Sequence, residues 1–436
     1  MNIMNANHLN QKILMVLLVG CWLLPFSIWA SDSMNVEPVQ DTSLQALFLL
    51  GLENSPTITF AVAQQNAALN NQKIADSFLK PEVSFQSELS YAWMEKQSYA
   101  RTASQLQASY PLYQPDREDR SSIASYQLSE RRLQLEETKQ ALGLKISNLY
   151  FNYWIQKSEQ EFLQKEFESI SEIMMQVKQR FTIGYQDLND ISDIQARLDS
   201  NRADLIRIEQ NLRITEIDLE AALGVEIDLS KFPPPSILPA HINLLSHQND
   251  FAGLVEQHPA LLRYEQMLFA SRKQMEYEKN KDGVVVQAFG AIVNNQSDGY
   301  FYDDAQGAKV GLKLSVPLYL AGRTSAATAK ARAESNQVSA LKRQQELLLT
   351  ASLQNAVESS QHNQKRLSAL KDVLESNKQA LTAAENGLST GNRNILDLLD
   401  AQRNVHRAER DITIVINRLW NNWYLYQWSQ GEIPVS

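Results

Sequence analysis

The sequence predicts a mainly α-helical chain with a transmembrane β portion, built from two tandem structural repeats. Three observations predict this class: two proline-free stretches of about 67 residues, short segments in which polar and apolar residues alternate, and local motifs that recur after about 205 residues. Each repeat is expected to run in the order helix, strand, strand, long helix, helix.

The N-terminal segment has the layout of a secretory signal. Lys12 is followed by an uncharged run from Ile13 to Ala30, and polar residues begin at Ser31. A single membrane anchor is the alternative, because the apolar run is about long enough to span a bilayer. Pro25 and the small Ala30 at the expected cleavage point favour removal of residues 1–30.

The chain has one cysteine, Cys21, inside this segment. It follows Leu18-Val19-Gly20, a pattern similar to the lipidation motif of bacterial lipoproteins, so lipidation at Cys21 is a second possibility. The apolar run continues past Cys21 to Trp29, which favours cleavage after Ala30. The mature chain then has no cysteine and therefore no disulfide framework. Both possibilities imply export.

Composition and motifs argue against several function classes. The chain carries 50 acidic and 41 basic residues and no long basic block, which is unfavourable for nucleic-acid binding. The six histidines are scattered, and His406 is interpreted as a packed or surface residue because metal sites need clustered ligands. No phosphate-binding glycine loop is present. We therefore expect no enzyme activity, cofactor or metal.

The repeats are marked by three pairs of motifs in the same order. A proline-rich stretch, Phe232-Pro233-Pro234-Pro235, separates the two halves and cannot be helical. The pairs are Asn54-Ser55-Pro56 with Gln257-His258-Pro259, Tyr110-Pro111-Leu112-Tyr113 with Val316-Pro317-Leu318-Tyr319, and Ile183-Gly184 with Thr390-Gly391.

Each half holds a pair of predicted strands followed by a long helix. Alternation from Val83 to Trp93 places apolar residues on one face and polar residues on the other. The long helices carry leucines every seven residues, such as Leu128, Leu135 and Leu142, and each would extend roughly 100 Å. Such helices are too long for a compact globule and must pack beside other helices. Shorter helices stacked end to end, among them those starting near Pro56 and Pro259, are expected to pair with them.

The predicted domains follow from these elements. They are a signal peptide over 1–30; a first repeat over 31–224, with strands near 83–93 and 105–113 and helices over 116–182 and 187–223; a linker over 225–250; and a second repeat over 251–436, with strands near 284–293 and 308–319 and helices over 323–390 and 394–428.

Four strands per chain cannot close a sheet in lipid, where an open edge leaves backbone groups unpaired at several kcal/mol each. We therefore predict closure by several copies. Three copies give a trimeric 12-stranded β-barrel, continued by an α-helical coiled-coil barrel. The polar face would line water in the barrel lumen, with Glu88, Gln105, Gln107, Lys309 and Lys313.

Two segments carry a more specific resemblance. Arg180-Phe181-Thr182-Ile183-Gly184 with Asp190, and the stretch from Gly391 to Gln402, are similar to motifs of the TolC-like outer-membrane efflux protein (OEP) family. The resemblance covers nearly all of residues 40–430. It implies that Gly184 and Gly391 lie in turns at a periplasmic tip, where glycine accepts a positive φ and where an adaptor makes contact.

The resemblance also implies roles for charged residues at this tip. Asp397 and Asp400 correspond to acidic rings that constrict the tip and select cations, and Asp190 and Arg393 to a charged gate network. Ordinary helix N-terminal capping is the alternative for the aspartates. Leu388 departs from the family pattern, which has a tyrosine there in its best-studied member, so the gate is expected to be weaker or wired differently.

The implied function is the outer-membrane channel of a tripartite efflux or type I secretion system, extending into the periplasm. Its implied partners are two further copies of the chain, a periplasmic adaptor (membrane fusion) protein, an inner-membrane RND or ABC transporter, and outer-membrane lipid. A periplasmic adaptor, or a structural coiled-coil protein without a pore, is the alternative. Such adaptors have one helical hairpin, whereas this chain duplicates both strand pair and coiled coil.

Overall fold

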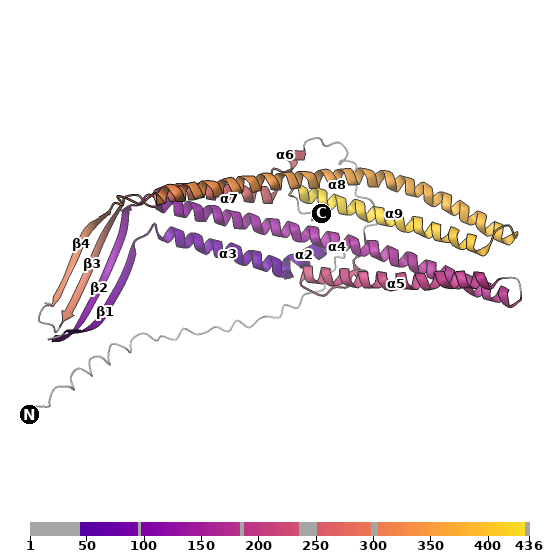
Figure 1. The fold of residues 1–436 in the computed structure, drawn as a ribbon, viewed down its shortest axis with the longest axis horizontal. Helices are drawn as coiled ribbons and strands as arrows, with labels where there is room; N and C mark the ends of the chain where they lie inside the picture. The colour runs from indigo at the N-terminus through magenta and orange to yellow at the C-terminus, as the bar shows by residue number, and fades with distance from the viewer. Residues whose placement is uncertain (1–43, 95–96, 184–186, 235–250, 298–303, 432–436) are drawn as a thin grey trace, which may run out of the picture. The chain divides into compact units, whose positions relative to one another are not determined.

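The computed structural model describes residues 44–94, 97–183, 187–234, 251–297 and 304–431 (Figure 1). The predicted signal peptide, Cys21 and Gly184 lie outside the described residues. Among the described helices, none alone is both long and apolar enough to cross a membrane. One bent pair, Leu44–Asn54 with Pro56–Ser77, passes the same criteria of length and composition when taken together.

Both halves have the predicted order of strands and helices. The first half contains α2 (Leu44–Asn54), α3 (Pro56–Ser77), β1 (Glu82–Met94), β2 (Gln97–Tyr113), α4 (Arg117–Thr182) and α5 (Leu188–Leu223). The second contains α6 (Phe251–Val255), α7 (Pro259–Asn280), β3 (Val285–Ser297), β4 (Ala305–Ser315), α8 (Arg323–Ser389) and α9 (Ile395–Ser429). A short 3-10 turn, η1 (Leu229–Lys231), lies in the predicted linker.

The bounds of three predicted strands are wrong. The strand expected near 105–113 begins at Gln97, and the strand expected near 284–293 ends at Ser297. The strand expected over 308–319 begins earlier, at Ala305, and ends at Ser315. β4 ends where its partner strand β3 begins, because Val285 pairs with Ser315, and Pro317 beyond it has no N–H to donate to a strand ladder. Residues 316–320 form no regular element before α8.

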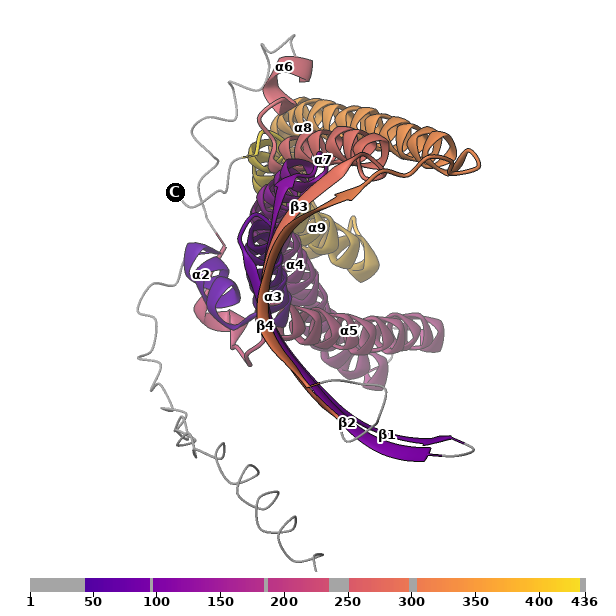
Figure 2. The ribbon, with the colours of Figure 1, turned by 90° about the vertical axis from the view of Figure 1, so that its left-hand side faces the viewer.

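The four strands form one antiparallel sheet in the order β1-β2-β3-β4, seen as a single curved layer in Figure 2. The two repeats meet in its centre, where β2 pairs with β3 over the register Arg101↔Ser297 to Pro111↔Gln287. Strands more than 170 residues apart in sequence are therefore neighbours, and within the described residues each repeat contributes two strands to the sheet.

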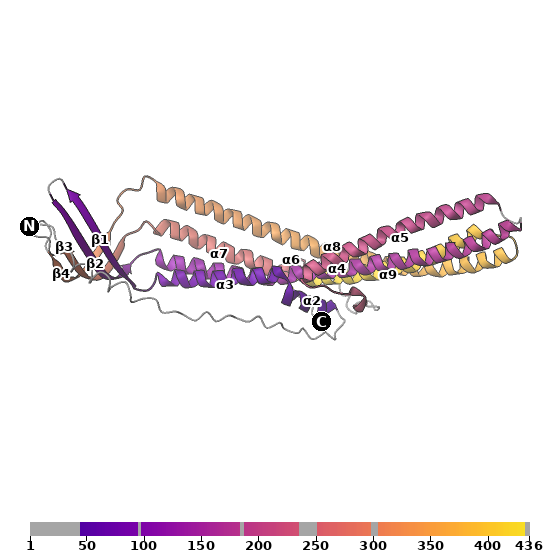
Figure 3. The same cartoon turned by 90° about the horizontal axis from the view of Figure 1, so that it is seen from below.

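The long helices run beside shorter ones, as predicted. Helices α3 and α5 pack along α4, and α7 and α9 pack along α8, with the strands at one end and the α4/α5 and α8/α9 hairpins at the other (Figures 1 and 3). Helix α4 also packs on α7 and α9, so it joins the two repeats.

Two glycines make the end-to-end stacking possible. Gly224 ends α5 in the left-handed conformation with φ 80°, and a Cβ there would lie 2.5 Å from the carbonyl oxygen of Asn54, just before α3. Gly431, just after α9, has φ 86°, and a Cβ there would lie 3.0 Å from Cδ of Pro259, the first residue of α7. Each short-helix junction thus depends on a missing side chain.

The heptad leucines are core residues. Leu128, Leu142, Leu212 and Leu219 are buried, and Leu367 and Leu419 are buried in the second half. One apolar cluster forms around α2, α4 and α5, and another around α8 and α9. A third joins the two hairpins near their turns, with Ile173, Val177 and Ile194 from the first and Ile395 and Leu399 from the second.

Candidate functional site

The sheet places all five predicted lumen residues on one face. Directly opposed residues of antiparallel strands share a face, and the register pairs Glu88 with Ala103 and aligns Gln107 with Ala291 and Lys309. Gln105 lies two residues from Gln107, and its Nε2 donates to the side-chain oxygen Oε1 of Gln107 at 2.6 Å. Lys313 is four residues from Lys309 and completes the same face.

The opposite face is apolar and exposed in the single chain. Leu89 and Trp93 are each 80% exposed, and Val310 is 89% exposed. Soluble monomers rarely expose a contiguous apolar surface of this kind, so the face requires an apolar environment. Its other exposed members include Val83, Phe85, Tyr91, Leu106, Ile292, Leu312 and Leu314.

The polar face also carries apolar residues of β3, and the largest of them is Phe289. Phe289 is opposite Gly311 in the register, and a Cβ on Gly311 would lie 2.9 Å from the Phe289 ring. The ring therefore lies across the space that the glycine leaves free.

The turn between α8 and α9 is built on two glycines. Gly391 has φ 78°, the positive φ that its sequence context predicts. The backbone amides of Asn392 and Arg393 donate to the carbonyl of Gly387, at 2.8 and 3.1 Å. The stem of Arg393 lies over Gly387, where a Cβ would be 2.5 Å from Arg393 Cγ. Arg393 itself is exposed.

Asp397 forms a capping box at the start of α9. The Asn394 side chain accepts from the Asp397 amide at 2.7 Å, and the Asp397 carboxylate accepts from the Asn394 amide at 3.1 Å. The capping role weighed as the alternative for the aspartates is therefore present at Asp397. The acidic ring, which needs several copies, stays a prediction.

Asp400 is paired across the hairpins. Its carboxylate accepts from Nη1 of Arg197 in α5 at 2.7 Å, while Asp400 lies in α9. Asp190 lies half-buried in the first turn of α5, where the helix N-terminus favours an acidic side chain. Its predicted network with Arg393 stays a prediction.

Leu388, which departs from the family pattern, packs against the apolar cluster that joins the hairpins. That cluster includes Ile395 and Leu399 of α9 and Ile194 of α5. An apolar contact therefore occupies the position where the resemblance places a polar tyrosine.

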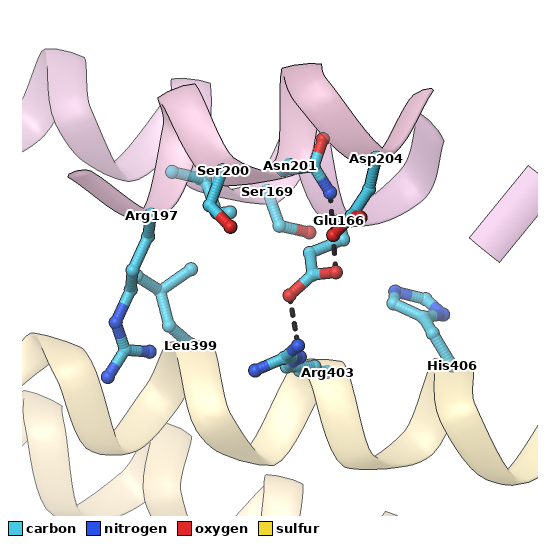
Figure 4. A pocket seen from close by; sticks show the side chains of 10 residues that line it. Glu166, Ser169, Arg197, Ser200, Asn201, Asp204, Leu399, Arg403 and His406 are labelled. Carbon is cyan, nitrogen blue, oxygen red and sulfur yellow. Dashed lines mark hydrogen bonds and ion pairs between the residues drawn. The ribbon is translucent and has the colours of Figure 1, made fainter. Parts of the chain in front are cut away.

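A polar cluster that adjoins this apolar region was not predicted from the sequence (Figure 4). Glu166 of α4 is 8% exposed and accepts from Arg403 of α9 at 2.7 Å and from the Asn201 amide of α5 at 3.3 Å. These side chains line a cavity of about 100 Å³ together with Arg197 and His406. The seven-residue spacing could have predicted that Asn201 is buried, because Asn201 lies seven residues from both Ile194 and Ile208, in the same core series.

Further ion pairs fix α9 on α4. Arg410 contacts Glu159 at 3.1 Å and stacks over the Phe162 ring at 4.6 Å. His406 is partly buried, and its Nδ1 lies 3.5 Å from the Glu409 carboxylate one turn along the same helix. The described residues contain no group of three or more candidate metal ligands.

Known proteins are similar to this chain in sequence and in fold. Residues 50–225 and 254–418 match the family described as outer membrane efflux protein. The chain is 25% identical to the outer membrane protein TolC of Vibrio cholerae over 419 residues, which cover 90% of this chain and 91% of that protein. It is 24% identical over 250 residues to the proteases secretion protein PrtF of Dickeya chrysanthemi, covering 56% of this chain and 54% of that protein. The crystal structure of CusC superposes with a TM-score of 0.79 at 16% identity, covering 90% of this chain and 93% of that one.

The fold is that of an outer-membrane channel protein, with one two-faced sheet and paired helical hairpins. The chain belongs to the outer membrane efflux protein family. It is a TolC-like channel of the outer membrane that extends into the periplasm and serves efflux or type I secretion. The alternative of an adaptor or structural coiled coil is not supported.

Proposed function

We propose that three copies of this chain close into one 12-stranded barrel, which forms the outer-membrane exit of a passive conduit. One observation carries the proposal: β1 and β4 are the outermost strands of a four-stranded sheet whose exposed face is apolar. Each outer strand has one edge that pairs with no other strand among the described residues.

The energetics favour closure. β1 spans 13 residues and β4 spans 11, so a sheet left open in lipid would leave backbone groups unpaired along both edges. Each such group costs several kcal/mol in hydrocarbon, and pairing β4 of one copy with β1 of the next removes the cost. Three copies are favoured because twelve strands enclose a lumen wide enough for water. The face with Glu88 and Lys309 then lines that lumen.

Cysteine cross-linking tests the closure. We expect pairs of cysteines in each chain, one on the outer edge of β1 and one on the outer edge of β4, to form disulfides between neighbouring copies at one register, giving a covalent trimer on a denaturing gel. The matched positive control is Ser87→Cys with Ser104→Cys, whose hydroxyl oxygens lie 2.9 Å apart across β1 and β2 of one chain. Cross-linking of the control pair with none between the edges would reject closure by copies.

We further propose that the hairpin turns form a closed periplasmic tip. Asp190 and Arg393 would hold neighbouring copies together, and Asp397 and Asp400 would face the narrow opening. Three of these residues support this by their positions in the first two turns of α5 and α9, and Arg393 lies in the turn just before α9. Arg393→Ala is then expected to raise single-channel conductance, whereas Lys309→Ala, on the sheet, is expected to leave the closed tip unchanged. An unaltered current in the Arg393 variant would reject the gate network.

The tip also supplies the expected partner surface. We propose that the turns near Gly184 and Gly391 contact a periplasmic adaptor, which links the channel to an inner-membrane RND or ABC transporter. In this proposal the conduit is passive and opens when the adaptor docks at the tip. Site-specific photo-cross-linkers at the exposed Asn392 are expected to capture the adaptor, while the same probe at exposed Arg343, far along α8, serves as the control. Equal capture at both positions would reject the tip as the docking site.

A further inference from the structure

The ion pair between Arg197 and Asp400 bears on how the tip treats ions. A ring of aspartates selects cations only if its charge is uncompensated, because the attraction depends on net charge near the ion path. Here the Asp400 carboxylate accepts from the Arg197 guanidinium of the same chain at 2.7 Å. Each copy that contributes an acidic group at this level thus also contributes a basic one.

The surroundings keep Arg197 close to Asp400. The Asp400 side chain is 54% exposed and Arg197 is 39% exposed, so both charges can act on ions in the opening. Beside them, Leu399 of α9 and Ile194 of α5 are buried in the cluster that joins the hairpins. This apolar contact fixes the distance between the two helices on which the charged pair stands. The pair is therefore a feature of the packed hairpins, even though an exposed ion pair contributes little stability by itself.

We infer that Arg197 is a selectivity-determining residue, which cancels the charge of Asp400 and makes the tip less cation-selective than an acidic ring alone would be. The inference rests on the proposed position of Asp400 at the narrow opening. In a trimer the Asp400 and Arg197 charges sum to zero at this level. Asp397 remains as the acidic residue of α9 nearest the α8/α9 turn. Its carboxylate accepts a hydrogen bond from the Asn394 backbone amide.

Five variants measured by reversal potential in planar bilayers test the inference. Arg197→Gln removes three positive charges from the trimer and is expected to raise the cation-to-anion permeability ratio about fivefold near 0.1 M salt, for charges about 10 Å from the ion path. Asp400→Asn leaves the arginines uncompensated and is expected to lower the ratio by a similar factor. The double variant is expected to return to the parent value.

The matched control is Arg207→Gln. Arg207 lies on the same helix and its guanidinium pairs with Asp204 at 3.0 Å, but that pair stays within α5 and is about 15 Å further from the turn by the helix rise. The control should leave the permeability ratio unchanged.

The outcomes separate the two levels of the proposal. If Asp400→Asn lowers the ratio while Arg197→Gln leaves it unchanged, a ring exists and the compensation is rejected. If Asp397→Asn, Asp400→Asn and Arg197→Gln all leave the ratio unchanged, the proposed narrow tip itself is rejected. Opposite shifts for the two single variants, restored in the double variant, support the inference.

Discussion

The junction between α5 and α3 gives a sharp test of the fold, because Gly224 combines two separate requirements. Its φ of 80° is a conformation that L side chains rarely adopt, and its missing Cβ would lie 2.5 Å from the Asn54 carbonyl oxygen and 3.3 Å from Cδ of Pro56. Gly322, at the start of α8, has the same φ of 80°, but a Cβ there would have no atom within 4 Å. The two alanine variants therefore share the strain but not the collision.

The expected magnitudes follow from this difference. Gly322→Ala is expected to cost about 1–2 kcal/mol, the penalty of a side chain in the left-handed region. Gly224→Ala carries the same penalty and adds an overlap with backbone, which cannot rotate away, at about 2 kcal/mol more. Gly224→Ala is therefore expected to lower the free energy of unfolding by about 3–4 kcal/mol per chain and to loosen the end-to-end contact of α5 and α3.

Thermal unfolding of both purified variants, followed by intrinsic fluorescence in the same detergent, measures the difference. We expect Gly224→Ala to lower the unfolding temperature at least twice as much as Gly322→Ala. Limited proteolysis near residues 224–234 should also accelerate only in the Gly224 variant. Equal shifts for the two variants would refute the close approach at this junction.

Three further predictions follow from single contacts. Val310→Lys, in the middle of the apolar face, should cost about 2–4 kcal/mol in lipid and reduce the amount of folded protein in outer-membrane fractions, whereas Gln107→Lys on the polar face should be tolerated; equal membrane yields would contradict the assignment of faces. Burial lowers the pKa of His258 from 6.5 to about 4, so the unfolded chain binds a proton that the folded chain does not, and stability should fall by up to roughly 3 kcal/mol as pH drops from about 6.5 to 4. His258→Asn, which keeps a capping acceptor for α7, should flatten the dependence of the unfolding temperature over this range, and an unchanged slope would count against the buried neutral ring. Arg403→Met leaves the Glu166 carboxylate without its cation and should destabilise the hairpins by about 2 kcal/mol; the cost is modest because water can reach the half-exposed arginine site. Hydrogen exchange over residues 395–405 measures this loss, and adding Glu166→Gln should restore more than half of it. A single variant with unchanged hydrogen exchange would reject this ion pair as a stabilising contact.

Much of this architecture is predictable from the sequence because its signals are periodic. The seven-residue leucine spacing predicts the long helices to within about one residue of their observed ends, since no proline interrupts them. The alternation from Val83 to Trp93 sorts the two faces of β1, and the register places Glu88 and Lys309 on the same face of the sheet. Periodicity carries such information because one face of each element is apolar.

Other features depend on contacts between segments far apart in sequence. The Glu166–Arg403 pair joins residues of different repeats, and no local pattern indicates that they meet. Gly224 and Gly431 repeat at the same spacing as the turn motifs, but only their close approach to Asn54 and Pro259 shows why glycine is required. Asp400 resembles a family ring residue, and no sequence pattern indicates that Arg197 lies beside it.

The central claim is that the four-stranded sheet of one chain is too small to close into a barrel in lipid. Native mass spectrometry of the detergent-solubilised, processed protein tests this claim most directly. We expect particles of three chains, which stay intact until a denaturing detergent or heating disrupts the barrel. A folded particle of one chain that retains its β-sheet signal would contradict the claim.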